Sequence, residues 1–255
     1  MARFLICLIG TGLSLTLTTC TPLMVPMDQT QQASPSPKTA VAPSGDLEFA
    51  AIQPPHERRA GVDVYSIRSL RDAINAHTEL HAALVGEGAG LSLMDERLAD
   101  VPVILLSYPP AESEWRTFTQ YLLAGGFFIT AASQSRAIDE GLKAQGLQEF
   151  YTADLPEKHP VFNALYDLQK APATGTPNQV PTLTGCFVQG RLAGVFAEGP
   201  LWSISRTPQN AAGLPPRIKL IINLMAYALQ EEGSLTWKRQ HPEGTSPADP
   251  ASIKK

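Results

Sequence analysis

The fold is decided by residues 101–133, VPVILLSYPPAESEWRTFTQYLLAGGFFITAAS. This stretch contains two short apolar runs, Val101–Tyr108 and Phe127–Ala132. Runs of this length, bounded by turn residues, are typical of buried strands rather than helices. Within them, Val103–Leu106 and Phe127–Ile129 are continuously apolar, which favours a parallel sheet that is covered on both faces.

A helix is predicted between the two runs. Trp115, Phe118 and Leu122 recur at the spacing that places side chains on one face of a helix. Glu112 and Glu114 precede this stripe, where negative charge favours a helix N-terminus, and the glycine pair 125–126 ends it. Strand, helix and strand joined by short links predict a right-handed parallel crossover unit and therefore an α/β domain.

Length and charge limit the possible functions. A chain of 255 residues can form one sizeable α/β domain with extensions. Its net charge of −4 and the lack of a basic stripe argue against a nucleic-acid partner.

The N-terminus is predicted to be a targeting segment. Arg3 is followed by the apolar run Phe4–Leu17, which at about 14 residues is shorter than the roughly 20 that span a bilayer. Leu17-Thr18-Thr19-Cys20 resembles the lipobox of bacterial lipoproteins, although Thr19 stands where glycine, alanine or serine is usual. We expect lipidation at Cys20 and a membrane anchor; an ordinary secretory signal is the alternative. Thr21 is not an inner-membrane retention signal, which favours the periplasmic side of an outer membrane.

Composition divides the rest of the chain. Residues 21–45 are rich in Pro, Ser and Gln without periodicity, which predicts a disordered tether. Residues 46–232 are predicted to form a single α/β domain, and 233–255 a disordered tail. Within the domain we expect the following further elements: strands at Leu47–Ile52 and Leu80–Val85; helices at Tyr65–Ala76, Ser133–Gln145 and Ile218–Leu229; a hairpin of Cys186–Val188 and Leu192–Phe196; and irregular structure at Asp154–Leu183.

Five signatures in this order resemble a bacterial domain-of-unknown-function family, number 4159. They are Pro102–Leu106, Tyr121–Phe127, His159–Phe162, Gly190–Ala193, and Asn223 with Tyr227–Leu229. The resemblance implies a fold similar to class I glutamine amidotransferases: a three-layer, flavodoxin-like, mostly parallel sheet with helices on both faces. Acidic residues commonly follow the Gly-Gly-Phe strand in that family, whereas Ala131, Ala132 and Ser133 stand there in this chain. The resemblance implies no activity.

No nucleophile stands where an amidotransferase would need one. Such a site requires a cysteine on a sharp strand-to-helix turn with a histidine beside it, and Ser133 occupies the equivalent place without flanking glycines. We expect Ser133 to cap a helix. Cys186 lies in an apolar run and is predicted to be a small buried residue. His77 and His81 lack a third ligand, so neither a metal site nor a cofactor is predicted.

Three other polar residues have two interpretations each. His159 lies in a loop, where it forms a structural hydrogen bond or serves a catalytic or ligand role. Arg191 forms an ion pair with Asp167 or Glu198, or binds an anion. Asn223 interrupts an apolar helix and is expected to satisfy a backbone group rather than a substrate.

The carboxyl ends of the strands provide the predicted ligand site. Ligands of open α/β sheets bind beyond these ends, and two serine-containing segments follow strands there. The residues expected at this edge are Ser107, Tyr108, Ser133, Gln134, Ser135 and Arg136. Hydroxyl groups, an arginine and a helix N-terminus favour a small anionic ligand.

Two functions follow. The first is a noncatalytic binding module of an envelope lipoprotein, which recognises an envelope protein or a small anionic ligand. The second is a hydrolase that uses Ser133 or His159 on amide or glycan bonds of the envelope. No complete set of catalytic groups can be assembled from the sequence, which favours the binding module.

Overall fold

A computed structural model describes residues 45–53, 64–86, 90–168, 183–198 and 214–242. These ranges belong to one compact unit, Pro37–Lys255. The expected signal peptide, the Cys20 lipidation site and the tether up to residue 44 lie outside them, as do residues 243–255 of the expected tail. None of the helices in the described ranges has both the length and the apolar character that a bilayer crossing requires.

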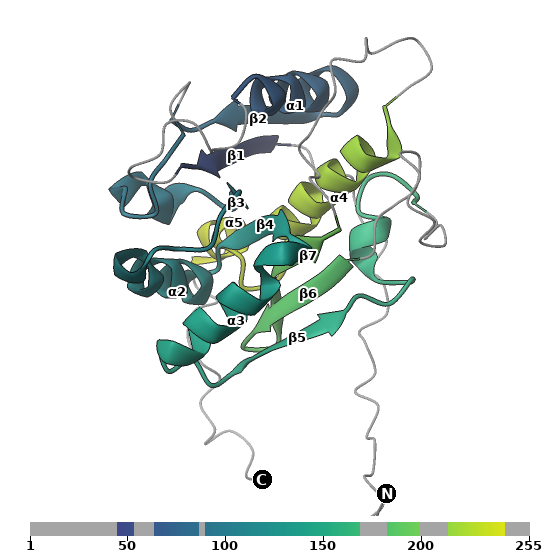
Figure 1. The fold of residues 1–255 in the computed structure, drawn as a ribbon. Helices are drawn as coiled ribbons and strands as arrows, with labels where there is room; N and C mark the ends of the chain where they lie inside the picture. The colour runs from purple at the N-terminus through teal and green to yellow at the C-terminus, as the bar shows by residue number, and fades with distance from the viewer. Residues whose placement is uncertain (1–44, 54–63, 87–89, 169–182, 199–213, 243–255) are drawn as a thin grey trace, which may run out of the picture. The chain divides into compact units, whose positions relative to one another are not determined.

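The centre of the fold is a seven-stranded sheet in the order β2-β1-β3-β4-β7-β6-β5 (Figure 1). Its strands are β1 (Gly45–Ile52), β2 (Leu80–Leu84), β3 (Val103–Leu106), β4 (Phe127–Ala131), β5 (Phe150–Asp154), β6 (Leu183–Val188) and β7 (Arg191–Ala197). The first five in spatial order, β2 to β7, are parallel to one another. β6 pairs antiparallel with β7, and β5 pairs antiparallel with β6. The sheet is therefore mostly parallel, as predicted.

The crossover unit predicted from residues 101–133 is confirmed. β3 and β4 lie side by side and parallel, with Val103 opposite Phe127 and Leu106 opposite Thr130. Helix α2 (Trp115–Ala124) joins them. It ends at Gly125, whose φ of 115° is left-handed, a conformation that glycine adopts without strain.

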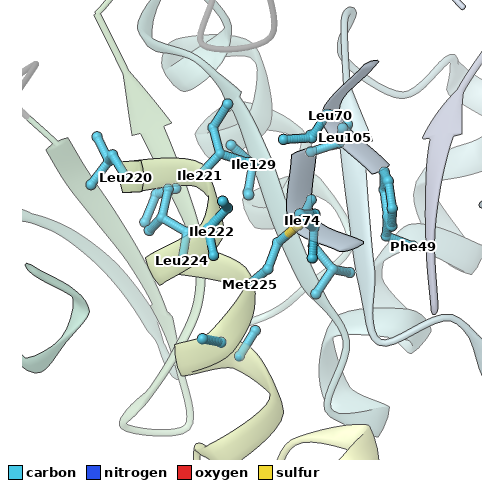
Figure 2. Close-up of a cluster of buried hydrophobic side chains, with 14 of the residues drawn as sticks. Phe49, Leu70, Ile74, Leu105, Ile129, Leu220, Ile221, Ile222, Leu224 and Met225 are labelled. Carbon is cyan, nitrogen blue, oxygen red and sulfur yellow. The ribbon is translucent and has the colours of Figure 1, made fainter. Parts of the chain in front are cut away.

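Helices cover both faces of the sheet. Successive side chains of a strand point to opposite faces, and because both sets are apolar, each face needs helices that bury it. Val103 and Leu105 face the first core, with α1 (Val64–His77) and α4 (Pro216–Gln230). Ile104 and Leu106 face the second core, with α2 and α3 (Ser135–Ala144). We call these the first face and the second face. Figure 2 shows the first core, where Met225 extends from α4 toward Ile74 of α1.

Short 3-10 turns join several elements. They are η1 (Glu96–Asp100), η2 (Glu112–Glu114), η3 (Ala132–Gln134) and η4 (Pro160–Phe162). Ser133 lies within η3, and α3 begins at Ser135 with no side-chain cap hydrogen bond, so the prediction that Ser133 caps this helix is wrong. The hairpin prediction is confirmed: β6 and β7 are antiparallel, and Gln189 and Gly190 between them have φ values of 53° and 77°.

Two elements differ from the sequence prediction. β5 was not expected; four of its five residues are exposed, so it lacks the alternation that marks a half-buried strand. Helix α5 (Leu235–Gln240) lies in the expected disordered tail, which makes that prediction wrong for residues 233–242. Ser234 starts α5 by accepting a hydrogen bond from Trp237 N at 3.1 Å.

Candidate functional site

Five parallel strands end at one edge of the sheet, which we call the carboxyl edge. Ile52, Leu106 and Thr130 are aligned there by the strand register. From β1 the chain continues to α1 on the first face, whereas from β3 it continues to α2 on the second face. Ligands of open α/β sheets bind where neighbouring connections diverge in this way. The end of β3 is therefore the place to look for a site.

The link from β3 to α2 contains an unusual group of side chains. Ser107 Oγ, Tyr108 Oη and Glu114 Oε1 are shielded from solvent and lack a hydrogen-bond partner. Two other side-chain atoms in the described ranges share this condition, Thr119 Oγ1 and Arg217 Nε. Three of the five such atoms thus fall within residues 107–114. We call Ser107, Tyr108 and Glu114 the oxygen cluster.

Glu114 is the most buried member of the cluster, with 1% of its surface exposed. Its Oε2 accepts a hydrogen bond from Ala111 N at 2.9 Å, which fixes the carboxylate at the start of α2. Oε1 has no such partner. Negative charge at a helix N-terminus is favourable, but it does not replace the missing hydrogen bond.

Tyr108 keeps its proton at neutral pH. Burial raises the pKa of its phenol, and the negative charge of Glu114 raises it further. The hydroxyl group can therefore both donate and accept a hydrogen bond.

Buried oxygens without hydrogen-bond partners lower the stability of the free protein. Leaving one buried oxygen without a partner costs about 1–3 kcal/mol, and native proteins pair nearly all of these groups. A bound molecule that supplies hydrogen bonds would recover this free energy. The cluster is our candidate site.

Ser133, Gln134, Ser135 and Arg136, the other residues of the predicted anion site, follow β4 next to the end of β3. Ser133 is exposed. The guanidinium of Arg136 pairs with Glu140 at 2.8 Å on the surface of α3, where 89% of the arginine side chain is exposed. The charged group buried at the carboxyl edge is instead the carboxylate of Glu114, which repels anions.

Arg191 lies at the opposite edge, at the start of β7. Its guanidinium donates to the main-chain oxygens of Leu122 at 2.8 Å and Gly126 at 3.1 Å. Glu198, a predicted partner, follows the other end of the same strand. The acid whose charge acts most strongly on Arg191 is Glu231, and burial lowers the pKa of the guanidinium. Arg191 therefore holds the end of α2 in place.

His159 has a structural role in its turn. It starts η4, and its Nδ1 accepts a hydrogen bond from Val161 N at 3.2 Å. Burial lowers the pKa of its imidazole to about 4. Its ring lies 5.5 Å from that of Tyr227 on the first face, whereas Ser133 leads into α3 on the second face. The two candidates for hydrolysis are not brought together.

The remaining polar residues have structural positions. Asn223 accepts from Leu165 N and Tyr166 N at 3.1 and 2.7 Å, which confirms the backbone role predicted for it. Cys186 is buried, and its pKa is raised to about 12, so it is a neutral thiol. Histidine, cysteine and acidic residues form no metal-binding group in the described ranges.

Comparison with known proteins identifies the family. A family model described as Domain of unknown function (DUF4159) matches residues 49–229. The chain belongs to this family. A search of curated proteins found no match to this DUF4159 chain.

The DUF4159 chain also shows a distant similarity to a solved structure. It is a putative ThuA-like protein from Bacteroides uniformis ATCC 8492, with 12% sequence identity. The alignment covers 80% of this chain and 99% of that one, with a TM-score of 0.37.

The signature residues of the DUF4159 resemblance mostly hold the fold together. Tyr121 Oη lies 3.1 Å from Pro102 O and from Phe127 O, and a Cβ at Gly126 would meet its ring. Arg191 likewise donates hydrogen bonds to main-chain oxygens at the end of α2. These signatures therefore point to packing rather than to chemistry.

Sequence reasoning missed Glu114 as a site residue. In the sequence, Glu114 indicates only a favourable charge at a helix start. However, Glu114, Phe118 and Tyr121 recur at i, i+4 and i+7, which places the acid on the buried face of α2. An acidic residue on an apolar stripe was the signal that could have found it.

Proposed function

We propose that this chain is an envelope lipoprotein whose α/β domain is a noncatalytic binding module. In this proposal a lipid on Cys20 anchors the chain to the periplasmic side of a membrane, with an outer membrane favoured, and the residues between Cys20 and β1, which begins at Gly45, link the anchor to the domain. The domain has a flavodoxin-like, glutamine amidotransferase-like arrangement. The order β2-β1-β3-β4-β7 supports this, since it corresponds to the flavodoxin order 2-1-3-4-5.

The oxygen cluster is the observation that supports binding. Ser107 Oγ, Tyr108 Oη and Glu114 Oε1 lack partners within the chain. They lie at the edge where ligands of open α/β sheets bind. A protein that keeps three unpaired buried oxygens in one link gives up stability, which is expected where a ligand completes the hydrogen bonds.

Thermal unfolding of the purified full-length chain tests the binding proposal. A panel of neutral sugars, amino sugars, amines, amino acids and organic acids is added, and a ligand that binds the folded state raises the unfolding midpoint. We expect Ser107→Ala and Tyr108→Phe to reduce the shift. Ser133→Ala is the matched control because this serine is exposed beyond the neighbouring strand. A hydrolase that uses Ser133 would instead lose substrate turnover in the control variant.

Membrane fractionation tests the anchor separately. The wild-type chain is expected in the membrane fraction with incorporated labelled fatty acid. Cys20→Ser is expected to release the chain and abolish the label. A Cys20→Ser chain that still carries the label would contradict the lipoprotein proposal.

A further inference from the structure

The two outer strands of the sheet differ in how their free edges are covered. β2 lies at one edge of the sheet and β5 at the other (Figure 1). At the β2 edge, Asn75 of α1 covers the main chain of Ala82: its Oδ1 accepts from Ala82 N at 2.6 Å, and its Nδ2 donates to Ala82 O at 3.1 Å. Main-chain groups at an uncovered strand edge can pair with another chain. The β2 edge is therefore protected at its centre.

The β5 edge has no comparable cover among the described residues. Leu155 N, which follows β5, donates to Leu183 O at 3.0 Å. Glu149 O, which precedes β5, accepts from Gln189 N at 2.8 Å. These bonds fix which residues bond to β6, because hydrogen-bonded and non-hydrogen-bonded pairs alternate in an antiparallel ladder. The N–H and C=O groups that point away from β6 are those of Phe150, Thr152 and Asp154.

β5 also lacks the residues that commonly keep an edge strand from pairing. Its sequence, FYTAD, contains neither proline nor lysine, and its aromatic and β-branched residues favour strand pairing. Tyr151 is 54% exposed, although its ring stacks on that of Phe187 in β6 at 4.8 Å. Exposed aromatic surface therefore lies beside the open main-chain groups.

We propose that β5 pairs antiparallel with β5 of a second copy of this chain. Thr152 lies midway between Phe150 and Asp154, so a two-fold axis at Thr152 sets each outward N–H of one copy against an outward C=O of the other. Asp154, the charged residue of the strand, then lies opposite Phe150 rather than a second acid. The strand is thus complementary to itself, which points to a second copy rather than to a different protein.

The same register brings the exposed aromatic rings together. Tyr151 of one copy lies diagonally across from Tyr151 of the second copy, at about 7–8 Å, a separation that aromatic side chains can bridge. Each tyrosine already stacks on Phe187 of its own chain. The pairing would therefore cover apolar surface as well as main-chain groups, and it would join the two sheets into one.

Sedimentation equilibrium of the purified full-length chain tests the pairing. We expect the wild type to form a dimer reversibly as its concentration rises. Thr152→Pro removes an outward N–H but no hydrogen bond to β6, so we expect it to weaken dimerisation at least tenfold. Thr152→Ala is the matched control: it changes the same side chain but keeps the N–H, and we expect it to retain most of the affinity.

Cysteine substitutions test the register. Facing residues of a hydrogen-bonded antiparallel pair have Cα atoms about 5.5 Å apart, which a disulfide can span. We therefore expect Thr152→Cys to form a reducible dimer on mild oxidation. Asp154→Cys is the control, because in this register it lies four residues, or about 14 Å, from its counterpart in the second copy. The wild type, which has the same native cysteines, gives the background.

A wild type that sediments as a monomer at every concentration, or a dimer that Thr152→Pro leaves unchanged, would overturn the proposal. Equal crosslinking of Thr152→Cys and Asp154→Cys, or larger oligomers in place of a closed pair, would also overturn it. If Thr152→Pro fails to fold, as circular dichroism would show, the two cysteine variants decide. Ligand binding at the carboxyl edge is measured separately and does not depend on the outcome.

Discussion

The guanidinium of Arg191, at the start of β7, donates a hydrogen bond of 2.8 Å to the main-chain oxygen of Leu122, in the last turn of α2. A second donation, at 3.1 Å, reaches Gly126 O. A helix leaves its last carbonyl oxygens without intrahelical donors. Arg191 supplies donors from a strand that lies far along the chain, and so ties the crossover helix to the hairpin.

Removing this side chain is expected to destabilise the fold. Hydrogen bonds to charged groups contribute about 1.5–3 kcal/mol, so we expect Arg191→Ala to lower the free energy of unfolding by about 2–3 kcal/mol. Urea unfolding measures this. Arg136→Ala is the control, since that arginine makes an exposed surface pair, and no measurable loss is expected. An equal loss in both variants would count against the capping role of Arg191.

Gly126 is expected to tolerate no side chain. A Cβ there would overlap the ring of Tyr121, and overpacking of this kind costs about 1–3 kcal/mol. We expect Gly126→Ala to destabilise the chain by that amount. In a double-mutant cycle with Tyr121→Leu, the cost should fall sharply, because the ring has gone. An unchanged cost would show that the ring is not the cause.

Helix α5 is expected to be part of the folded domain. Leu235 N donates to Gly125 O at 3.1 Å, and Lys238 Nζ donates to Ala124 O at 2.8 Å, at the end of α2. Deleting residues 233–255 removes these donors and should cost about 2 kcal/mol. Deleting 243–255 alone removes none of them and should leave the unfolding curve unchanged. Equal curves for the two deletions would mean that α5 contributes nothing.

Stability is expected to fall in acid through His159. Its folded pKa is about 4 and its ordinary value 6.5, so between these values the unfolded chain binds more protons. Stability is therefore full above about pH 6.5 and falls as the pH drops toward 4. We expect about 1–2 kcal/mol after allowing for partial exposure of the ring. His159→Asn should flatten this part of the pH profile, and an unchanged profile would contradict the assignment.

The sequence predicted the elements that lie in the cores. The apolar runs of β3 and β4 and the stripe Trp115, Phe118, Leu122 describe burial directly, and their parallel pairing followed from the short links. β5 was not predicted because most of its side chains are exposed and show no apolar alternation. Its strand conformation depends on pairing with β6. Helix α5 was not predicted because the contacts that hold it are with the end of α2, which is distant in the sequence.

The site was predicted only in part. Ser107 and Tyr108 were expected at the carboxyl edge because strand ends gather there. Hydroxyl groups, Arg136 and a helix N-terminus favoured an anionic ligand in the sequence; the surface pairing of the Arg136 guanidinium with Glu140 depends on the helix on which both residues lie. The burial of Glu114 is indicated by its place on the stripe with Phe118 and Tyr121, whereas the lack of a partner for its Oε1 depends on how α2 packs against the sheet.

Two tyrosine hydroxyl groups provide the most direct test of the central claim, that the link after β3 is kept for a ligand. Tyr121 Oη has hydrogen-bond partners in Pro102 and Phe127, whereas Tyr108 Oη has none. The measurement is the free energy of unfolding of Tyr108→Phe and Tyr121→Phe without ligand. We predict a loss of about 1–3 kcal/mol for Tyr121→Phe and no loss, or a gain, for Tyr108→Phe. An equal loss in both would show that the Tyr108 hydroxyl serves the fold, and would contradict a site reserved for a ligand.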